Sequence, residues 1–216
     1  MTLASCDSRK TAGENPFFTE WDTPHGVPPF DKILPEHFMP AFERGMSLHE
    51  AEIDAITSNK DEATFENTIL AYDNAGQMLA QTELVFGMLC AAETNDRMQA
   101  LQEQAMPLLA AHRDKIRLDD KLFVRVKEVY DRRAALGLDA EQMRLLQKTY
   151  DSFVRAGALL DAEQKARLKE INGQLSLTAV KFGNNILAEN NNFVLELKSD
   201  ELDGLPAGIR DAAREK

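Results

Sequence analysis

His49 and Glu50 open a five-residue stretch, His-Glu-Ala-Glu-Ile, that ends at Ile53. A zinc-peptidase helix carries a second histidine at the fifth place, because imidazoles one helical turn apart bind the metal together and the glutamate activates its water. Isoleucine supplies no ligand, and an aliphatic side chain at this place indicates packing. The stretch therefore predicts a surface His–Glu pair on an amphipathic helix, without a metal site.

The other three histidines stand apart in the sequence, at His25, His37 and His112. None has a second ligand at metal-binding spacing, so we expect each to lie at the surface or to cap a helix, although folding could bring two of them together. The sequence also lacks a phosphate-binding loop, a dinucleotide-binding glycine motif and a nucleophile elbow. Spacing alone therefore assigns no catalytic and no metal-binding residue.

The two cysteines, Cys6 and Cys90, do not indicate a disulfide framework. Cys90 falls in a helical apolar pattern, which favours a small buried side chain. Leu3 to Cys6 has the form of a bacterial lipobox followed by polar residues, so Cys6 is the candidate lipidation site. This predicts attachment to a membrane through lipid and a location in the cell envelope or periplasm. The basic and apolar parts of a signal peptide do not precede the box, so a chance match and a cytoplasmic location stay open.

The chain has 216 residues, enough for one large domain or two small ones with a sizeable core. Its 25 Lys and Arg against 36 Asp and Glu give a formal net charge of -11, which leaves no basic stripe for nucleic acid. Helix-favouring residues such as Ala, Leu, Gln, Glu and Lys dominate the middle of the chain. No apolar run approaches the length that spans a membrane. The composition predicts a mainly helical protein that does not bind nucleic acid.

The chain divides into four segments by composition. Residues 1–14 are a polar tether, and residues 15–34 are an extended arm rich in aromatic residues, in which prolines forbid a continuous helix. Residues 35–192 are a helical lobe. Residues 193–216 begin a strand, a turn and a further helix from about Ala207, and this last segment looks truncated.

Caps and apolar periodicity place the helices of the lobe. The first runs from Pro35 to about Ser58, and the second has an apolar face that extends to Cys90. Thr64 is expected to cap the second helix, and Asp139 and Asp161 are expected to cap the fifth and the longest. The helices between them are expected to start around Thr94-Asn95-Asp96 and at Asp119-Asp120. Pro107 predicts a kink or break, and the asparagines at 190–192 end the longest helix.

The longest helix carries an apolar stripe that we expect to lie in the core. Its members are Leu168, Ile171, Leu175, Ala179, Phe182 and Ile186. Phe193 to Leu197 then alternates like a short strand, whose hydrogen-bonding partner is missing because no comparable run exists in the chain. The expected fold class is all-α with one short strand near the C-terminus.

Several stretches, taken in order, resemble one family. They are NPFF with a following Trp, ILPEHFMPAFERGM, AEIDAI, TFENTILAYDNAG, ETND, PLLAAHRDKI, LFVRVKEVYDRR, RLKEINGQLSLTAVKFGNNIL and ELDGLP. Together they resemble the N-terminal region of peptidyl-dipeptidase Dcp (dipeptidyl carboxypeptidase), within the thimet-oligopeptidase-like zinc metallopeptidases. Each piece is weakly specific, but the ordered set is specific and covers the chain from about Asn15 onward.

This resemblance implies the N-terminal helical lobe of a two-lobed enzyme, monomeric at full length, with a deep channel for short unfolded peptides. Enzymes of this branch release dipeptides from peptide C-termini with one Zn2+. Their zinc helix, a further glutamate ligand and the tyrosine and histidine that stabilise the transition state lie far downstream. The resemblance therefore transfers no catalytic or metal-binding residue to this chain, and it makes the motif-like stretch at His49 an accident. The partners that it implies are short peptides and a separate catalytic lobe.

Two interpretations stay open on the sequence. The chain is either the non-catalytic lobe of such a peptidase, forming a wall or lid of its channel, or a non-enzymatic helical adaptor of the envelope, derived from that lobe, that binds peptides or a partner without cutting them. The unpaired strand and the abrupt end favour the first. A stop codon directly after Lys216, with a stable monomer in solution, would favour the second.

Overall fold

A computed structural model describes residues 15–198 and 201–214 of the chain. The regular structure in these residues is helical, which confirms the predicted all-α fold class. The chain forms two units, one that ends at Lys181 and one that begins at Phe182. Among the described residues, no helix is both long and apolar enough to cross a membrane.

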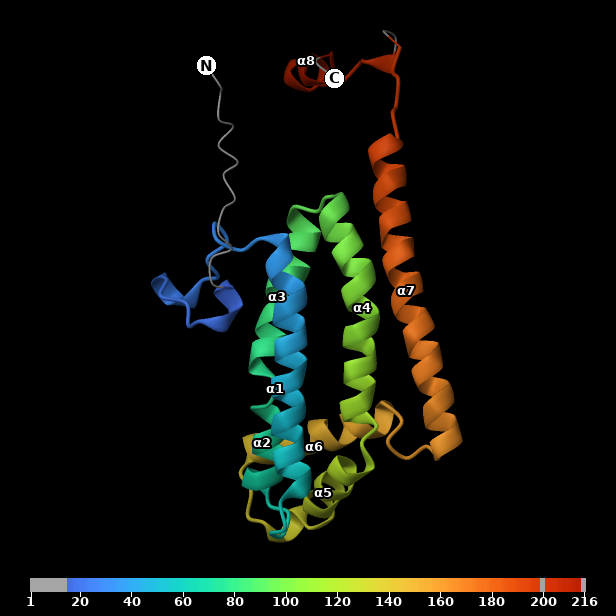
Figure 1. The fold of residues 1–216 in the computed structure, drawn as a ribbon. Coiled ribbons are helices and arrows are strands. Elements are labelled where there is room, and N and C mark those ends of the chain that lie inside the picture. The colour runs from blue at the N-terminus through green and yellow to red at the C-terminus, as the bar shows by residue number, and fades with distance from the viewer. Residues whose placement is uncertain (1–14, 199–200, 215–216) are drawn as a thin grey trace, which may run out of the picture. The chain divides into compact units, whose positions relative to one another are not determined.

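The helices follow one another with short connections. In chain order the α-helices are α1 (Phe38–Ser58), α2 (Ala71–Asp73), α3 (Gln77–Ala92), α4 (Asp96–Arg117), α5 (Asp120–Asp131), α6 (Ala140–Arg155), α7 (Ala162–Asn192) and α8 (Ala207–Arg214). The shorter turns are η1 (Pro16–Phe18), η2 (Pro24–Gly26), η3 (Pro35–His37), the π-helical η4 (Phe65–Leu70) and η5 (Arg133–Ala135). Figure 1 shows α1, α3 and α4 side by side in the first unit, with α5 and α6 across one end of them.

The five helix starts expected from the sequence each carry a side-chain cap. The side chain of Thr64 accepts from the backbone N–H of Asn67, and Asn95 accepts from the N–H groups of Arg97 and Met98. Three aspartates cap α5, α6 and α7 in the same way, at Asp119, Asp139 and Asp161. Each cap satisfies backbone donors that have no partner within the helix, which is why these positions fix where the helices begin.

Aromatic rings join the arm before α1 to the helices. Phe38 is fully buried, with its ring centroid 5.3 Å from that of Phe17 in the arm and 4.9 Å from that of Phe86 on α3. The indole of Trp21 donates to the carbonyl of Pro16 at 2.9 Å, which holds the arm in its folded path. Residues 15–34 therefore lie on the body of the first unit.

A buried arginine fixes the loop between α1 and η4. Arg125 on α5 is 8% exposed, and its guanidinium donates to the carbonyls of Asn59 and Asp61 at 3.0 and 3.1 Å. It also donates to the side-chain oxygen of Asn67 at 3.1 Å. A buried cation needs such acceptors, because burial without them is costly.

Two helix boundaries differ from the predictions. The expected second helix is interrupted at residues 74–76, where Gly76 takes a left-handed conformation (φ 75°) and α3 begins anew. In contrast, α4 continues through Pro107, where a break was an alternative. A proline removes one helical hydrogen bond, but Ala105 and Leu109 on either side of it are buried and hold both turns in place.

The predicted core stripe of α7 is largely exposed, so that prediction is wrong for the described residues. Leu175 is 62% exposed and Phe182 is 66% exposed, whereas Val180, which the stripe omitted, is buried. An amphipathic stripe becomes core only where another element packs on it, and Leu175 instead lines an open groove within the first unit. The predicted strand at Phe193–Leu197 is also not formed, because the described residues contain no second strand to pair with it.

Candidate functional site

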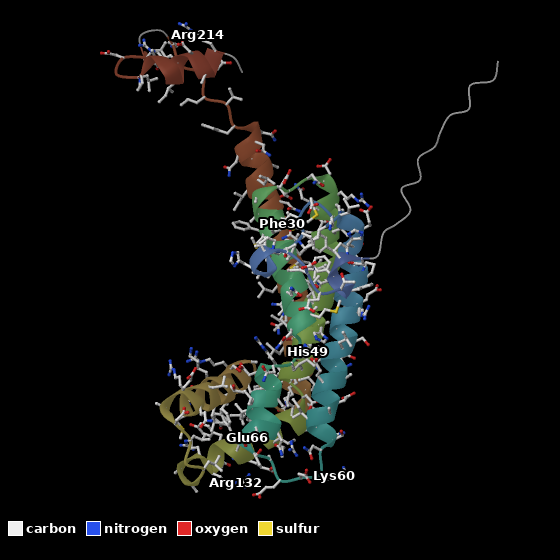
Figure 2. The ribbon with its side chains drawn as sticks, turned by 90° about the vertical axis from the view of Figure 1, so that its left-hand side faces the viewer. Phe30, His49, Lys60, Glu66, Arg132 and Arg214 are labelled. Carbon is white, nitrogen blue, oxygen red and sulfur yellow. The ribbon has the colours of Figure 1, made fainter. Side chains whose placement is uncertain are left out.

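The fold brings two of the scattered histidines together. His49 lies midway along α1 and His112 on α4, and their nitrogens Nδ1 and Nε2 are 3.0 Å apart. Figure 2 places His49 between Phe30 near one end of the first unit and Arg132 near the other. At this distance one of the two facing nitrogens carries a proton and donates the hydrogen bond, while the other is unprotonated and accepts it.

Burial and charge set the protonation of this cluster. Burial lowers the pKa of both His49 and His112 below the usual value, so both rings are neutral at pH 7. Glu50 lies 3.5 Å from Nδ1 of His112 and 2.8 Å from Nζ of Lys115, and the hydrogen bond from Lys115 lowers the pKa of its carboxyl group. Nδ1 of His112 is buried, and its contact with the carboxylate of Glu50 is too long to be a well-formed hydrogen bond. The cluster therefore links α1 to α4 through a neutral pair and one ion pair at its edge.

Gly76 completes the surroundings of His49. Its backbone N–H donates to the carboxylate of Glu52 at 2.6 Å, and a Cβ built on it would lie 2.9 Å from Nδ1 of His49. The left-handed backbone and the close imidazole both require glycine at this place. The glycine at the break before α3 therefore allows the backbone to lie directly against the ring of His49.

The structure confirms the predicted roles of some histidines and contradicts those of others. His37 caps, since its Nδ1 accepts from the backbone N–H of Leu34 at 3.0 Å, and His25 is exposed, as expected. The surface role is wrong for His112, which is 5% exposed, and His49 is half-buried. Ile53 is buried, as its place after the His–Glu pair predicted. The burial of His112 could have been predicted from the apolar residues around it in the sequence of α4, since a histidine on an apolar helix face tends to be buried.

The described part of the chain offers no cluster for a metal. Across residues 15–198 and 201–214, no group of three or more His, Cys, Asp or Glu side chains could hold an ion. The lipidation candidate Cys6 lies outside the described residues. Cys90 on α3 is half-buried, and burial raises the pKa of its thiol, which makes it a poor nucleophile.

A groove of about 560 Å3 lies along α4, between it, the end of α6 and residues 168–180 of α7. A hydrogen bond from Asn172 to Asp114, at 2.9 Å, bridges its two long sides. Its lining residues are Gln102, Met106, Ala110, Arg113, Asp114, Arg117, Arg155, Ala156, Leu168, Asn172, Leu175, Ser176, Ala179 and Val180. The volume is in the range of sites that take small molecules or short peptide segments.

Three arginines and one aspartate are the charged side chains that line this groove. Arg113 and Arg117 are one turn apart on α4 and Arg155 is the last residue of α6, while Asp114 is the acidic side chain of the lining. Arg117 also hydrogen-bonds the phenol of Tyr72, whose pKa burial raises and Arg117 lowers. The groove is therefore cationic in a chain whose formal net charge is -11.

Comparison of the sequence with those of known proteins shows which family the chain resembles. The chain is 41% identical over 176 residues, 82% of its length, to dipeptidyl carboxypeptidase of Escherichia coli (strain K12), and 38% identical over 174 residues to the enzyme of the same name in Salmonella typhimurium. The resemblance to the peptidyl-dipeptidase branch is confirmed. Oligopeptidase A of Escherichia coli is a more distant relative, with 24% identity over 193 residues. No protein-family model matches the chain.

The chain matches only part of these dipeptidyl carboxypeptidases. The matched region is 26% of the length of both the Escherichia coli and the Salmonella typhimurium proteins, so the chain spans about a quarter of the curated relatives that it matches. These relatives carry peptidase names, and the peptidase chemistry that the names state belongs to those longer proteins. The similarity by itself assigns no role to the quarter of those proteins that this chain matches.

Proposed function

We propose that this chain is the N-terminal, non-catalytic lobe of a zinc metallopeptidase that releases dipeptides from the C-termini of short peptides. The observation that carries the proposal is the 41% identity to a dipeptidyl carboxypeptidase over 82% of the chain. Identity at this level over so many residues implies the same local fold and the same place within the longer protein. We call that longer protein the parent enzyme.

The residues of this chain do not fit the zinc ion that the family implies. The 216-residue sequence contains no His-Glu-x-x-His motif, and the described residues contain no cluster of three potential ligands. His49 and His112 already bond each other, and the edge of the cluster holds a lysine. A cation beside a metal site would oppose metal binding. The ligands and the hydrolytic step therefore belong to the remainder of the parent enzyme.

The helices would act as a wall or lid of the peptide channel. Such a wall needs a rigid body with a concave face, and the first unit offers both: a fully buried aromatic core around Phe38 and the groove along α4. A lid of this kind excludes water and folded proteins from the reaction while it admits extended peptides. The peptide would meet this lobe through side chains and would be cut elsewhere in the parent enzyme.

The proposal extends to the place of the parent enzyme in the cell. Lipid attachment at Cys6 would tether it to a membrane of the cell envelope, as a monomer that acts on peptides outside the cytoplasm. Mass spectrometry of the protein isolated from its own membranes tests this, because a diacylated or triacylated N-terminal cysteine has a characteristic added mass. An unmodified Cys6 in protein recovered from the soluble fraction would contradict it.

The purified 216-residue chain tests the non-catalytic role. We expect it to release no dipeptides from a defined peptide, with or without added Zn2+, when the products are followed by mass spectrometry. Circular dichroism serves as the folding control, since the helices dominate the signal. Dipeptide release that a chelator abolishes would overturn the proposal.

A further inference from the structure

We propose that the groove along α4 binds the free C-terminal carboxylate of a peptide through Arg113, Arg117 and Arg155. The inference rests on the proposed function. An enzyme that releases dipeptides from the C-terminus must recognise that terminus, and a positively charged side chain can bind its carboxylate. It adds to that function a site, a ligand group and three residues. Neither the similarity to known peptidases nor the sequence pattern assigns a role to these arginines.

The positions of the three arginines favour a shared anionic ligand. Arg113 and Arg117 lie on the same face of α4, one turn apart, and Arg155 ends α6 at the same groove. Guanidinium groups stay charged at any physiological pH, so three exposed arginines that line one groove make it attractive to an anion. Asp114 is the acid of the lining, and it is already engaged as the acceptor of Asn172.

The arginines retain donors for a ligand. Arg113 donates from Nε to its own helix, at the carbonyl of Leu109, which leaves its terminal NH2 groups free of that bond. Arg117 hydrogen-bonds the phenol of Tyr72, whose ring centroid lies 5.2 Å from that of Phe153 near the end of α6. A guanidinium presents five N–H donors in a planar fork and binds a carboxylate with two parallel hydrogen bonds. One such fork can bind both oxygens of the carboxylate at the end of a peptide, and the other two guanidinium groups can each add a single hydrogen bond and positive charge.

The other side of the groove suits the peptide that carries the carboxylate. Met106, Leu168, Leu175 and Val180 supply apolar wall, while Asn172 and Ser176 supply polar groups that can bond a peptide backbone. This mixture is typical of sites in which apolar surface provides affinity and a few polar groups fix the orientation. Side-chain identity in the peptide would matter less than the presence of its free end.

Calorimetric titration of the full 216-residue chain tests the inference. The probes are acetyl-tetraalanine with a free C-terminal carboxylate, the same peptide as its C-terminal amide, and inorganic phosphate. We expect the free acid to bind about tenfold tighter than the amide or more, and phosphate to displace it poorly. Arg155→Gln and Arg117→Gln should each weaken binding of the acid about tenfold and leave binding of the amide unchanged. Arg155→Lys should retain part of the affinity, because the charge remains and the fork is lost.

Arg144→Gln is the matched control. Arg144 is also an exposed arginine of α6, but it does not line the groove, so its replacement should leave every affinity unchanged. Equal affinity for acid and amide, no binding of either, displacement by phosphate as effective as by peptide, or equal losses in Arg144→Gln and Arg155→Gln would each overturn the inference. The proposed function is judged separately, by dipeptide release from a chimera in which the matched 176 residues of Escherichia coli dipeptidyl carboxypeptidase are replaced by those of this chain. Either idea can therefore fail while the other stands.

Discussion

Nε2 of His112 lies 3.0 Å from Nδ1 of His49, and this bond joins α4 to α1 through two rings that are both neutral in the folded state. Two protonated rings could not form it, because both facing nitrogens would then be donors. The stretch at His49 resembles an incomplete zinc motif in the sequence. In the structure it forms a contact between α1 and α4 that depends on the protonation of the two histidines. The charged groups that face it are Glu50 and Glu52 from α1, Lys115 from α4 and Glu83 from α3.

The histidine pair makes the stability of the fold depend on pH. The folded pKa values of His49 and His112 lie below their unfolded values near 6.5, so the unfolded chain binds more protons in the interval between them. The contribution of the neutral histidine pair to the free energy of unfolding is complete above pH 6.5, and it is lost as the pH falls through the folded pKa values. The loss is at most about 1.4 kcal/mol per pH unit for each proton taken up. Urea unfolding at pH 7.5, 6.5 and 5.5 should show it.

His112→Gln isolates the contribution of the pair. This variant should be less stable than the wild type at pH 7.5 and should lose less stability on acidification to pH 5.5. His25→Gln, at an exposed position, should retain the wild-type pH dependence. The carboxyl group of Glu50 titrates below this window, since its pKa is lowered. An unchanged pH slope in His112→Gln would refute the role of the pair.

Two glycine substitutions should change stability in opposite directions. Gly76→Ala places a methyl group 2.9 Å from Nδ1 of His49 on a left-handed backbone, so we expect a loss of more than about 1 kcal/mol. Gly87→Ala in α3 meets nothing within 4 Å and should gain up to about 1 kcal/mol from helix propensity. Chemical denaturation of both variants checks the pair. Equal effects in the two would show that Gly76 is not required for the contact at His49.

Phe38 anchors the arm to the helices, and its removal should be among the most damaging single changes. Phe38→Ala deletes a fully buried ring that contacts Phe17, Phe42 and Phe86, at an expected cost of about 3–5 kcal/mol. The matched change at an exposed apolar position, Leu84→Ala, should cost less than about 0.5 kcal/mol. Thermal unfolding that ranks these two variants the other way would contradict the described core.

Local signals in the sequence predicted the helices well. Thr64 and Asp139 cap helices because their side chains satisfy backbone donors within three residues, and such short-range chemistry can be read directly from the sequence. The buried Ile53 followed from helical spacing in the same way. The family resemblance also rested on local stretches, and the 41% identity agrees with it.

What sequence reasoning missed depends on distant parts of the chain. His49 and His112 are 63 residues apart, so no spacing rule could pair them, and the groove arginines come from two helices. The exposed stripe of α7 was missed for a related reason: periodicity indicates an apolar face but not whether a partner covers it. The same holds for Phe193–Leu197, where alternation favoured a strand that has no partner among the described residues.

A chimeric enzyme tests the central claim most directly. In it, the matched 176 residues of Escherichia coli dipeptidyl carboxypeptidase are replaced by those of this chain, and the products of a defined peptide are followed by mass spectrometry. The account predicts zinc-dependent release of C-terminal dipeptides by the chimera, and no release when the segment is deleted. A chimera that folds and binds zinc but releases no dipeptides would contradict the claim that this chain is a lobe of such a peptidase.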